Sequence, residues 1–175
     1  MKSINFITWV FPILFMLHDF EEIILVEAWR KRYKIKLDKQ KARRLVFAGC
    51  KKTPAFSVGV AIEFLIISAV SLVSYLIGNY CFWYGLFFAF TIHLIGHCIV
   101  ILLYKFYVPG VITSILFLPC CLYVLHSTQQ ILQFTLVDIV LYCSIGVIVM
   151  MLLLCGLHKC MSFFEKEIAT FERQI

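Results

Sequence analysis

The sequence predicts an all-α fold, namely a polytopic membrane helix bundle with five transmembrane helices, and two observations lead to this prediction. Of the 175 residues, 62% are hydrophobic, whereas soluble domains usually contain about 45 to 50% apolar residues. The apolar residues gather in five stretches, several of which reach the roughly 20 residues that a helix needs to cross a bilayer. We therefore expect one integral membrane domain over residues 1–175.

The stretches give the expected spans in chain order: 4–27, 55–77, 82–104, 111–126 and 131–157. The start of the first span has the length of a secretory signal sequence. No small-residue cleavage site follows it, so we expect it to be retained. The fourth span is the shortest and contains Pro119, which is expected to kink the helix because proline has no backbone N–H.

The positions of the cations predict the orientation. Eleven of the 16 lysines and arginines lie between Arg30 and Lys52, in a basic loop over residues 30–54. Loops rich in Lys and Arg stay in the cytoplasm, which places the N-terminus outside, the C-terminus in the cytoplasm and 15 of the 16 cations on the inner side. Topology thus explains the net charge of +6 without a nucleic-acid partner. The expected partners of the basic loop are anionic membrane lipids, and the short loops favour a bacterial cytoplasmic membrane.

The end of the chain is expected to form a separate amphipathic helix over residues 162–174, lying on the inner leaflet. Ser162 and Glu165 fit a capping box. Three apolar side chains share one face of this helix: Phe164, Ile168 and Phe171. The eight cysteines lack paired metal-type spacing and lie mostly in or beside apolar spans. We therefore expect them to be structural.

The first span contains the polar sequence His18-Asp19-Phe20-Glu21-Glu22. At about 100° per residue, His18, Glu21 and Glu22 fall on one face of a helix, with Asp19 at its edge. Ionisable groups inside a membrane are costly, by roughly 2.5 to 3.5 kcal/mol at a helix centre. This acidic face is therefore expected to have partners on other helices.

Two other spans carry ionisable groups at the same depth. Glu63 is the only ionisable residue of the second span, and His93 and His97 lie one turn apart on the third. A rise of about 1.5 Å per residue places these groups and the first-span cluster in the inner half of the bilayer. Because no Lys or Arg lies inside any span, the acids require protonation, histidine or a bound cation.

A divalent metal ion fits this set best, because imidazole and carboxylate together suit zinc, iron or manganese. The expected cofactor is zinc or iron, as one or two ions. The expected ligands are His18, Glu22, Glu63, His93 and His97. A carboxylate that does not bind the ion, Glu21 or Glu22, is expected to act as general base.

The sequence Tyr107-Val108-Pro109-Gly110 is expected to be a simple tight turn in the cytoplasm, because proline presets φ and glycine tolerates the left-handed region. His126 and His158 lie at other depths along their spans. We therefore leave both histidines out of the expected site.

The whole pattern resembles the HXXEE family of small integral membrane proteins, over about residues 8–155. The segments that carry the resemblance are His18-Asp19-Phe20-Glu21-Glu22, Glu63, His93-Leu94-Ile95-Gly96-His97 and Tyr107-Val108-Pro109-Gly110. By this resemblance His18, Glu21 and Glu22 match the positions that name the family, and a histidine of the His93/His97 pair matches its further histidine. For the family's asparagine the chain offers only Asn5 and Asn79. The family has no known function, and the resemblance implies a membrane-bound metal-dependent hydrolase.

The sequence thus predicts a membrane-embedded metal-dependent enzyme, a hydrolase that acts on a lipid-like or membrane-delivered substrate at the inner leaflet. Three alternatives stay open. Iron at the same ligands would favour oxidation of a lipid. Chains of Asp, Glu and His inside membranes also mark ion or proton transport. In a non-catalytic membrane protein, the cluster would only join helices through hydrogen bonds.

Overall fold

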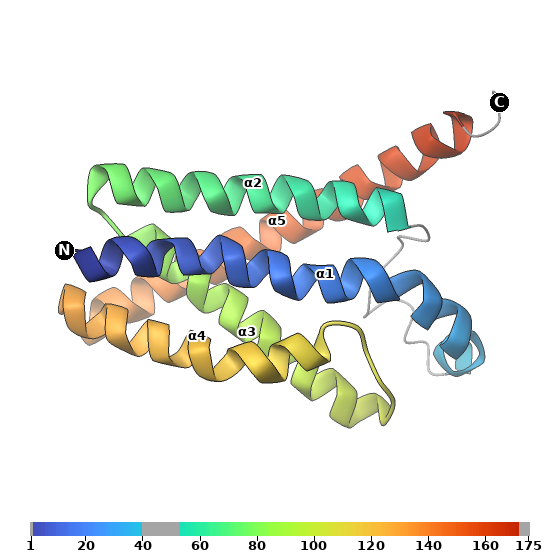
Figure 1. The fold of residues 1–175 in the computed structure, drawn as a ribbon, viewed down its shortest axis with the longest axis horizontal. Coiled ribbons are helices and arrows are strands. Elements are labelled where there is room, and N and C mark those ends of the chain that lie inside the picture. Colours follow the sequence, from blue (N-terminus) through green and yellow to red (C-terminus); the bar gives the residue numbers. More distant parts are fainter. Residues whose placement is uncertain (1, 40–52, 172–175) are drawn as a thin grey trace.

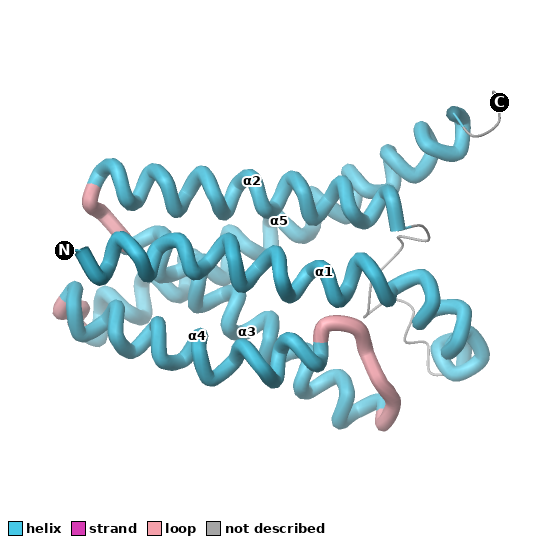
Figure 2. The backbone as a smooth tube through the Cα atoms, in the orientation of Figure 1, coloured by secondary structure: helices cyan, strands magenta, loops and turns pink. Residues whose placement is uncertain are grey.

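The computed structural model describes residues 2–39 and 53–171, and every regular element among them is an α-helix. The helices are α1 (Lys2–Lys39), α2 (Thr53–Ile77), α3 (Cys81–Tyr104), α4 (Val111–Leu132) and α5 (Leu136–Phe171). They lie side by side in an up-and-down bundle (Figure 1). The connections at 78–80 and 133–135 lie at the same end as the N-terminus, and the connection at 105–110 lies at the other end (Figure 2). The all-α prediction is confirmed for the described residues.

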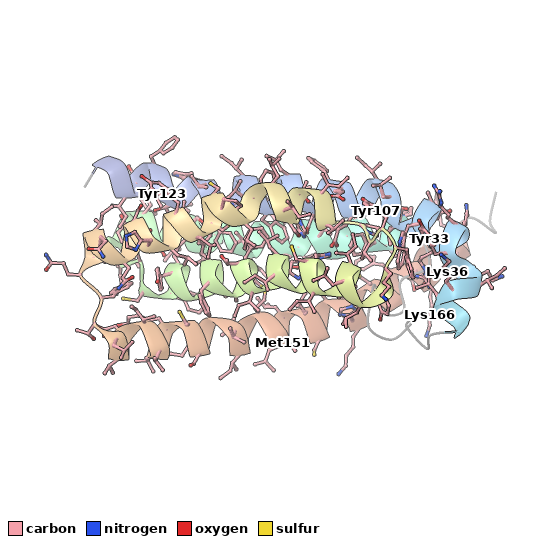
Figure 3. The ribbon with its side chains drawn as sticks, turned by 90° about the horizontal axis from the view of Figure 1, so that it is seen from below. Tyr33, Lys36, Tyr107, Tyr123, Met151 and Lys166 are labelled. Carbon is pink, nitrogen blue, oxygen red and sulfur yellow. The ribbon has the colours of Figure 1, made fainter. Side chains whose placement is uncertain are left out.

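Helices α2, α3, α4 and α5 are each long and apolar enough to cross a membrane. The chain is therefore a multi-pass membrane protein in contact with lipid. Helix α1 carries the polar cluster and is not one of these four helices, but it packs along α2 and α4 within the bundle. Tyr33, Lys36, Tyr107 and Lys166 gather at one end of the bundle, and Tyr123 lies toward the other (Figure 3).

Aromatic side chains join α1 to α3 in the half of the bundle near the N-terminus. Pro12 lacks a backbone N–H, so the carbonyl of Thr8 loses its helical partner. The indole of Trp83 donates to this carbonyl across the helix interface at 3.1 Å. Trp83 also stacks on Phe87 with ring centroids 5.1 Å apart, and Phe11 meets Phe87 edge-on at 5.2 Å. These three rings are almost completely buried and form the centre of the apolar core.

Two glycines allow α3 and α5 to approach closely. A Cβ atom at Gly85 would overlap the backbone of Tyr142, and one at Gly146 would overlap the backbone of Gly85. Small residues at a helix crossing let backbones approach in this way in membrane bundles. The crossing fixes α3, which carries His93 and His97, against α5.

The break between the last two helices lies later than the sequence predicts, because α4 continues to Leu132 and α5 begins at Leu136. Gln133 ends α4 in the left-handed region with φ of 52°. Thr135 then caps α5: the Asp138 amide donates to the Thr135 hydroxyl at 3.2 Å, and that hydroxyl donates to the Asp138 carboxylate at 2.6 Å. A Thr-x-x-Asp sequence is a helix-start signal that the hydropathy pattern alone does not reveal.

The prediction of a separate C-terminal helix is wrong for the described residues, because α5 continues without interruption to Phe171. No proline or glycine lies between Leu157 and Phe171, so Ser162 has no helix break to cap. Within the expected basic loop, α1 remains helical to Lys39, and residues 40–52 lie outside the described part of the chain, as do residues 172–175 of the expected tail helix.

Candidate metal centre

Two helices bring four potential metal ligands to one point. His18 and Glu22 lie one turn apart on α1, and His93 and His97 lie one turn apart on α3. The Nε2 atom of His93 lies 3.2 Å from Nε2 of His18 and 3.1 Å from Nε2 of His97. Glu22 Oε1 lies 2.9 Å from His97 Nε2 and 3.7 Å from His18 Nε2. The four ligand atoms all lie within 4.8 Å of one another.

The hydrogen bonds within this cluster are incomplete. Three ring nitrogens face one another, and a neutral imidazole can donate from only one of its two nitrogens. Within the described part of the chain, the buried Glu22 Oε1 has no well-aligned hydrogen bond, although His97 Nε2 is only 2.9 Å away. Ligands of a tetrahedral zinc ion, bound at 2.0 to 2.1 Å, would lie about 3.3 Å apart. Four of the separations lie between 2.9 and 3.7 Å and surround this value, and all the ligand atoms are within 4.8 Å of one another, so the residues could hold a divalent ion.

Glu21 points away from the four ligands, toward the beginning of α4. Its Oε2 accepts hydrogen bonds from the Thr113 hydroxyl at 2.6 Å and the Thr113 amide at 2.8 Å. Its Oε1 accepts from the Tyr107 hydroxyl and from the Ile112 amide at 3.3 Å. Burial and the hydrogen bond to Glu21 raise the pKa of Tyr107 above its ordinary value, so this phenol remains a donor. Thr113 also contacts Nδ1 of His18 at 2.9 Å.

The turn between α3 and α4 lies directly on the ligands, which its sequence did not indicate. Gly110 has φ of +86°, and a Cβ atom there would lie 2.8 Å from Glu22 Oε1 and 2.9 Å from the His18 ring. The indole of Trp29 donates to the Tyr107 carbonyl and ties the same turn to α1. The residues 105–110 therefore cover the cluster as well as connecting two helices.

A cavity of about 430 Å³ lies beside the ligands, among α1, α2, α3 and α5, and Val108 of the turn also lines it. Its polar wall consists of Asp19, Glu22, Glu63, His93, His97 and His158. Much of the remaining lining is apolar and includes Phe15, Phe56, Val60, Phe90, Met150 and Met161. Among the residues that the structure describes, no Lys or Arg lines the cavity. A ligand with an apolar part and a polar reacting group suits such a lining.

The structure brings four of the five expected metal ligands together: His18, Glu22, His93 and His97. The fifth, Glu63, is not among the converging atoms but lines the adjacent cavity with Asp19. His158, which is not among the expected site residues, also lines this cavity. Sequence reasoning missed Thr113 as well, since a threonine near the start of an apolar span has no distinctive pattern.

Fold and cluster together define a class: a multi-pass helical membrane protein with a buried group of histidines and a glutamate able to hold a metal ion. Within this class, residues 9–124 match the sequence model of the family described as protein of unknown function with HXXEE motif. The match covers more than half of the chain, which therefore belongs to the HXXEE family. No curated protein and no solved structure matches the chain.

Proposed function

We propose that the protein is a membrane-embedded, metal-dependent hydrolase that acts on a lipid-like substrate at the inner leaflet. One observation carries the proposal: three imidazole nitrogens and a buried carboxylate oxygen converge within 4.8 Å of one another, and four of the separations lie between 2.9 and 3.7 Å. A divalent ion held by His18, His93, His97 and Glu22 would lower the pKa of a water molecule and polarise a carbonyl or phosphoryl oxygen.

The cavity supports a division of roles among the remaining groups. Its apolar surface, which includes Phe56, Val60 and Met150, would bind the acyl part of a substrate. The polar reacting group would then lie against His93, His97 and Glu22. Asp19 and Glu63 have no hydrogen bond within the described part of the chain, and both line the same cavity. Either carboxylate is therefore free to accept or donate a proton within the cavity, whereas Glu21 already accepts four hydrogen bonds.

Two of the alternative functions fit these contacts less well. A conducting path would need polar groups through the whole bundle, but the half near the N-terminus is filled by Phe11, Trp83 and Phe87, each at most 1% exposed. A cluster that only joins helices would be expected to complete its hydrogen bonds. Nε2 of His93 lies within 3.2 Å of two other ring nitrogens, and one nitrogen of a neutral ring offers either one proton or one lone pair, so these contacts argue against this role.

Metal analysis of the detergent-purified protein tests the proposal. Protein prepared with excess zinc and iron and then freed of loosely bound metal should retain a transition metal in near-stoichiometric amount. The double variant His18→Ala/His97→Ala should lose it, and the control His126→Ala, which changes an exposed histidine of α4, should keep it. Wild-type protein that retains no metal would overturn the proposed cofactor and the hydrolase with it.

If metal is retained, a second measurement tests the reaction. Loaded protein in mixed micelles should release product from lipid esters or lipid phosphoesters, and Glu63→Gln should slow this release without removing the metal. Full metal content with no turnover of either ester class would refute hydrolysis and leave the lipid-oxidation alternative, which oxygen consumption by iron-loaded protein would reveal.

We also propose that α1 is a fifth span, with the N-terminus outside and the C-terminus in the cytoplasm. Its 38 residues are about 57 Å long at 1.5 Å per residue, which exceeds the roughly 30 Å hydrocarbon core. In a cysteine-free background, an impermeant maleimide applied to cells should label Ser3→Cys but not Lys36→Cys. Labelling of both from outside would contradict the orientation.

A further inference from the structure

Glu21 and Glu22 are adjacent in the sequence, but their carboxylates lie in different surroundings. Glu22 lies among the histidines, where its Oε1 lacks a hydrogen bond. Glu21 accepts four hydrogen bonds, two on each oxygen, and all four come from residues between 107 and 113. Glu21 is therefore engaged with the beginning of α4, and Thr113 is the only one of its partners that also contacts a candidate ligand.

The contacts of the Thr113 hydroxyl determine where its single proton lies. The oxygen lies 2.6 Å from Glu21 Oε2, 2.9 Å from His18 Nδ1 and 3.2 Å from the Gly110 carbonyl. An O–H···O⁻ separation of 2.5 to 2.7 Å is typical of a charge-assisted hydrogen bond, so the proton points to Glu21. The hydroxyl oxygen can then only accept a hydrogen bond from His18, so Nδ1 of His18 must carry a hydrogen and donate it.

This proton placement leaves Nε2 of the neutral His18 ring without a hydrogen. Nε2 is the atom that faces His93 and Glu22 at 3.2 and 3.7 Å. A metal-binding histidine usually donates its other N–H to an oxygen acceptor, which fixes the tautomer and the ring orientation. Here the acceptor is a threonine hydroxyl whose own proton is taken by a carboxylate.

We propose that Glu21 is a positioning residue that acts through Thr113: it orients the hydroxyl that holds His18 in the tautomer able to bind a cation through Nε2. The first glutamate of the HXXEE motif then orients the histidine through Thr113, and the second binds the ion directly. The same four hydrogen bonds anchor the start of α4, so that Gly110 rests on the ligands. The inference rests on the proposed cation site, and its tests separate the two.

Zinc affinity, measured by competition with a chromophoric chelator in detergent, tests the role of the hydroxyl. Thr113→Val removes the hydroxyl with little change of shape, and loss of such an outer partner typically weakens metal binding about 10- to 100-fold. Thr113→Ser keeps the hydroxyl and should restore binding close to that of wild type. Thr128→Val is the matched control, since Thr128 is a buried threonine of α4 whose hydroxyl makes no hydrogen bond within the described part of the chain, and this variant should bind zinc as wild type does.

Glu21→Gln and Tyr107→Phe distinguish the action of Glu21 on His18 through the Thr113 hydroxyl from the anchoring of the 105–110 turn. An amide at position 21 presents an NH₂ group to two of the four donors, so zinc binding should weaken as in Thr113→Val. Tyr107→Phe removes only one donor to Oε1 and leaves the Thr113 contacts intact, so its affinity should change far less. An equal loss of zinc affinity in both variants would show that anchoring of the turn, and not the action of Glu21 through Thr113, accounts for the loss.

The tautomer itself can be measured without metal. In ¹⁵N-histidine-labelled, metal-free protein, the His18 signals, assigned by their loss in His18→Gln, should show a protonated Nδ1 in wild type and Thr113→Ser. Thr113→Val should shift His18 toward the other tautomer. Protonation of His18 Nε2 in wild type, or zinc affinity in Thr113→Val equal to that of wild type, would overturn the proposal that Glu21 acts on His18 through Thr113. Failure of wild type to bind zinc would overturn the cation site while leaving the tautomer result to decide the hydrogen-bond assignment.

Discussion

The two ends of the α1–α3 interface differ in how completely their polar groups are hydrogen-bonded. Near the N-terminus, Phe11, Trp83 and Phe87 are packed against one another, and the Trp83 indole donates to the carbonyl that Pro12 leaves free. Near the other end, the same two helices direct histidines and Glu22 toward one point, where their hydrogen bonds stay incomplete. One interface therefore contains a region of packed aromatic rings and a region of convergent His and Glu side chains that could hold a metal ion.

This difference has an energetic consequence. A buried polar atom without a partner costs about 1 to 3 kcal/mol, so the cluster makes the metal-free bundle less stable. The aromatic region offsets that cost, because the dispersion contacts of closely packed rings are numerous. Changes in the aromatic region should therefore alter stability and leave metal affinity unchanged, whereas changes at the cluster should alter metal affinity.

The largest expected effect tests the aromatic region. Phe87 is fully buried between Phe11 and Trp83, so Phe87→Ala should lower the free energy of unfolding by about 3 kcal/mol through cavity formation. SDS unfolding in mixed micelles, followed by circular dichroism, measures this loss. The zinc content of the folded variant should equal that of wild type. A fall in zinc affinity as large as that of Thr113→Val would show that the two regions are not independent.

The next effect tests the binding region through stability. Zinc at 100 times its dissociation constant should raise the free energy of unfolding of wild type by about 2.7 kcal/mol, because it binds the folded state alone. Unfolding of His18→Ala/His97→Ala should not respond to zinc. Mg²⁺ at the same concentration is the control ion, since imidazole ligands do not suit it. An equal response of wild type and the double variant would place zinc binding elsewhere.

The sequence predicted much of this arrangement because its strongest signals are periodic. Apolar runs predicted the helices, and the i, i+4 spacing of His18 with Glu22 and of His93 with His97 predicted two ligand-bearing faces. Depth along the helices placed these faces together, and the structure joins them within 4.8 Å. Glu63 shares their depth but lies on the cavity wall, because depth alone does not give the rotation of a helix about its axis.

The parts that the sequence did not predict depend on contacts between distant segments. Thr113 lies 95 residues from His18, and nothing in its neighbourhood distinguishes it from other threonines of apolar spans. The glycine of the 105–110 turn was explained by its backbone conformation alone. Its second property, the close approach to Glu22 and His18, exists only after the helices have packed.

A smaller effect distinguishes the backbone conformation of Gly110 from its close approach to the ligands. Gly110→Ala introduces strain at φ of +86° and places a Cβ atom against the ligands, so it should cost about 2 kcal/mol and weaken zinc binding at least tenfold. Gly78→Ala is the matched control, since φ is +72° and no atom lies within 4 Å of the added Cβ. It should cost about 1 kcal/mol with unchanged zinc affinity. Similar zinc affinity in both variants would mean that the turn does not support the site.

The smallest effect concerns the end of the bundle near the N-terminus, away from the ligands (Figure 2). Thr135→Ala removes the hydroxyl that caps α5 and should cost about 1 kcal/mol, with no change in zinc affinity. Because residues 135 and 110 lie at opposite ends of the bundle (Figure 2), the stability losses of Thr135→Ala and Gly110→Ala should add within about 0.5 kcal/mol in the double variant. A larger coupling would mean that strain at Gly110 changes the stability of the opposite end of the bundle through α4. It would also mean that Pro119, the single proline of α4, does not separate the two ends of this helix.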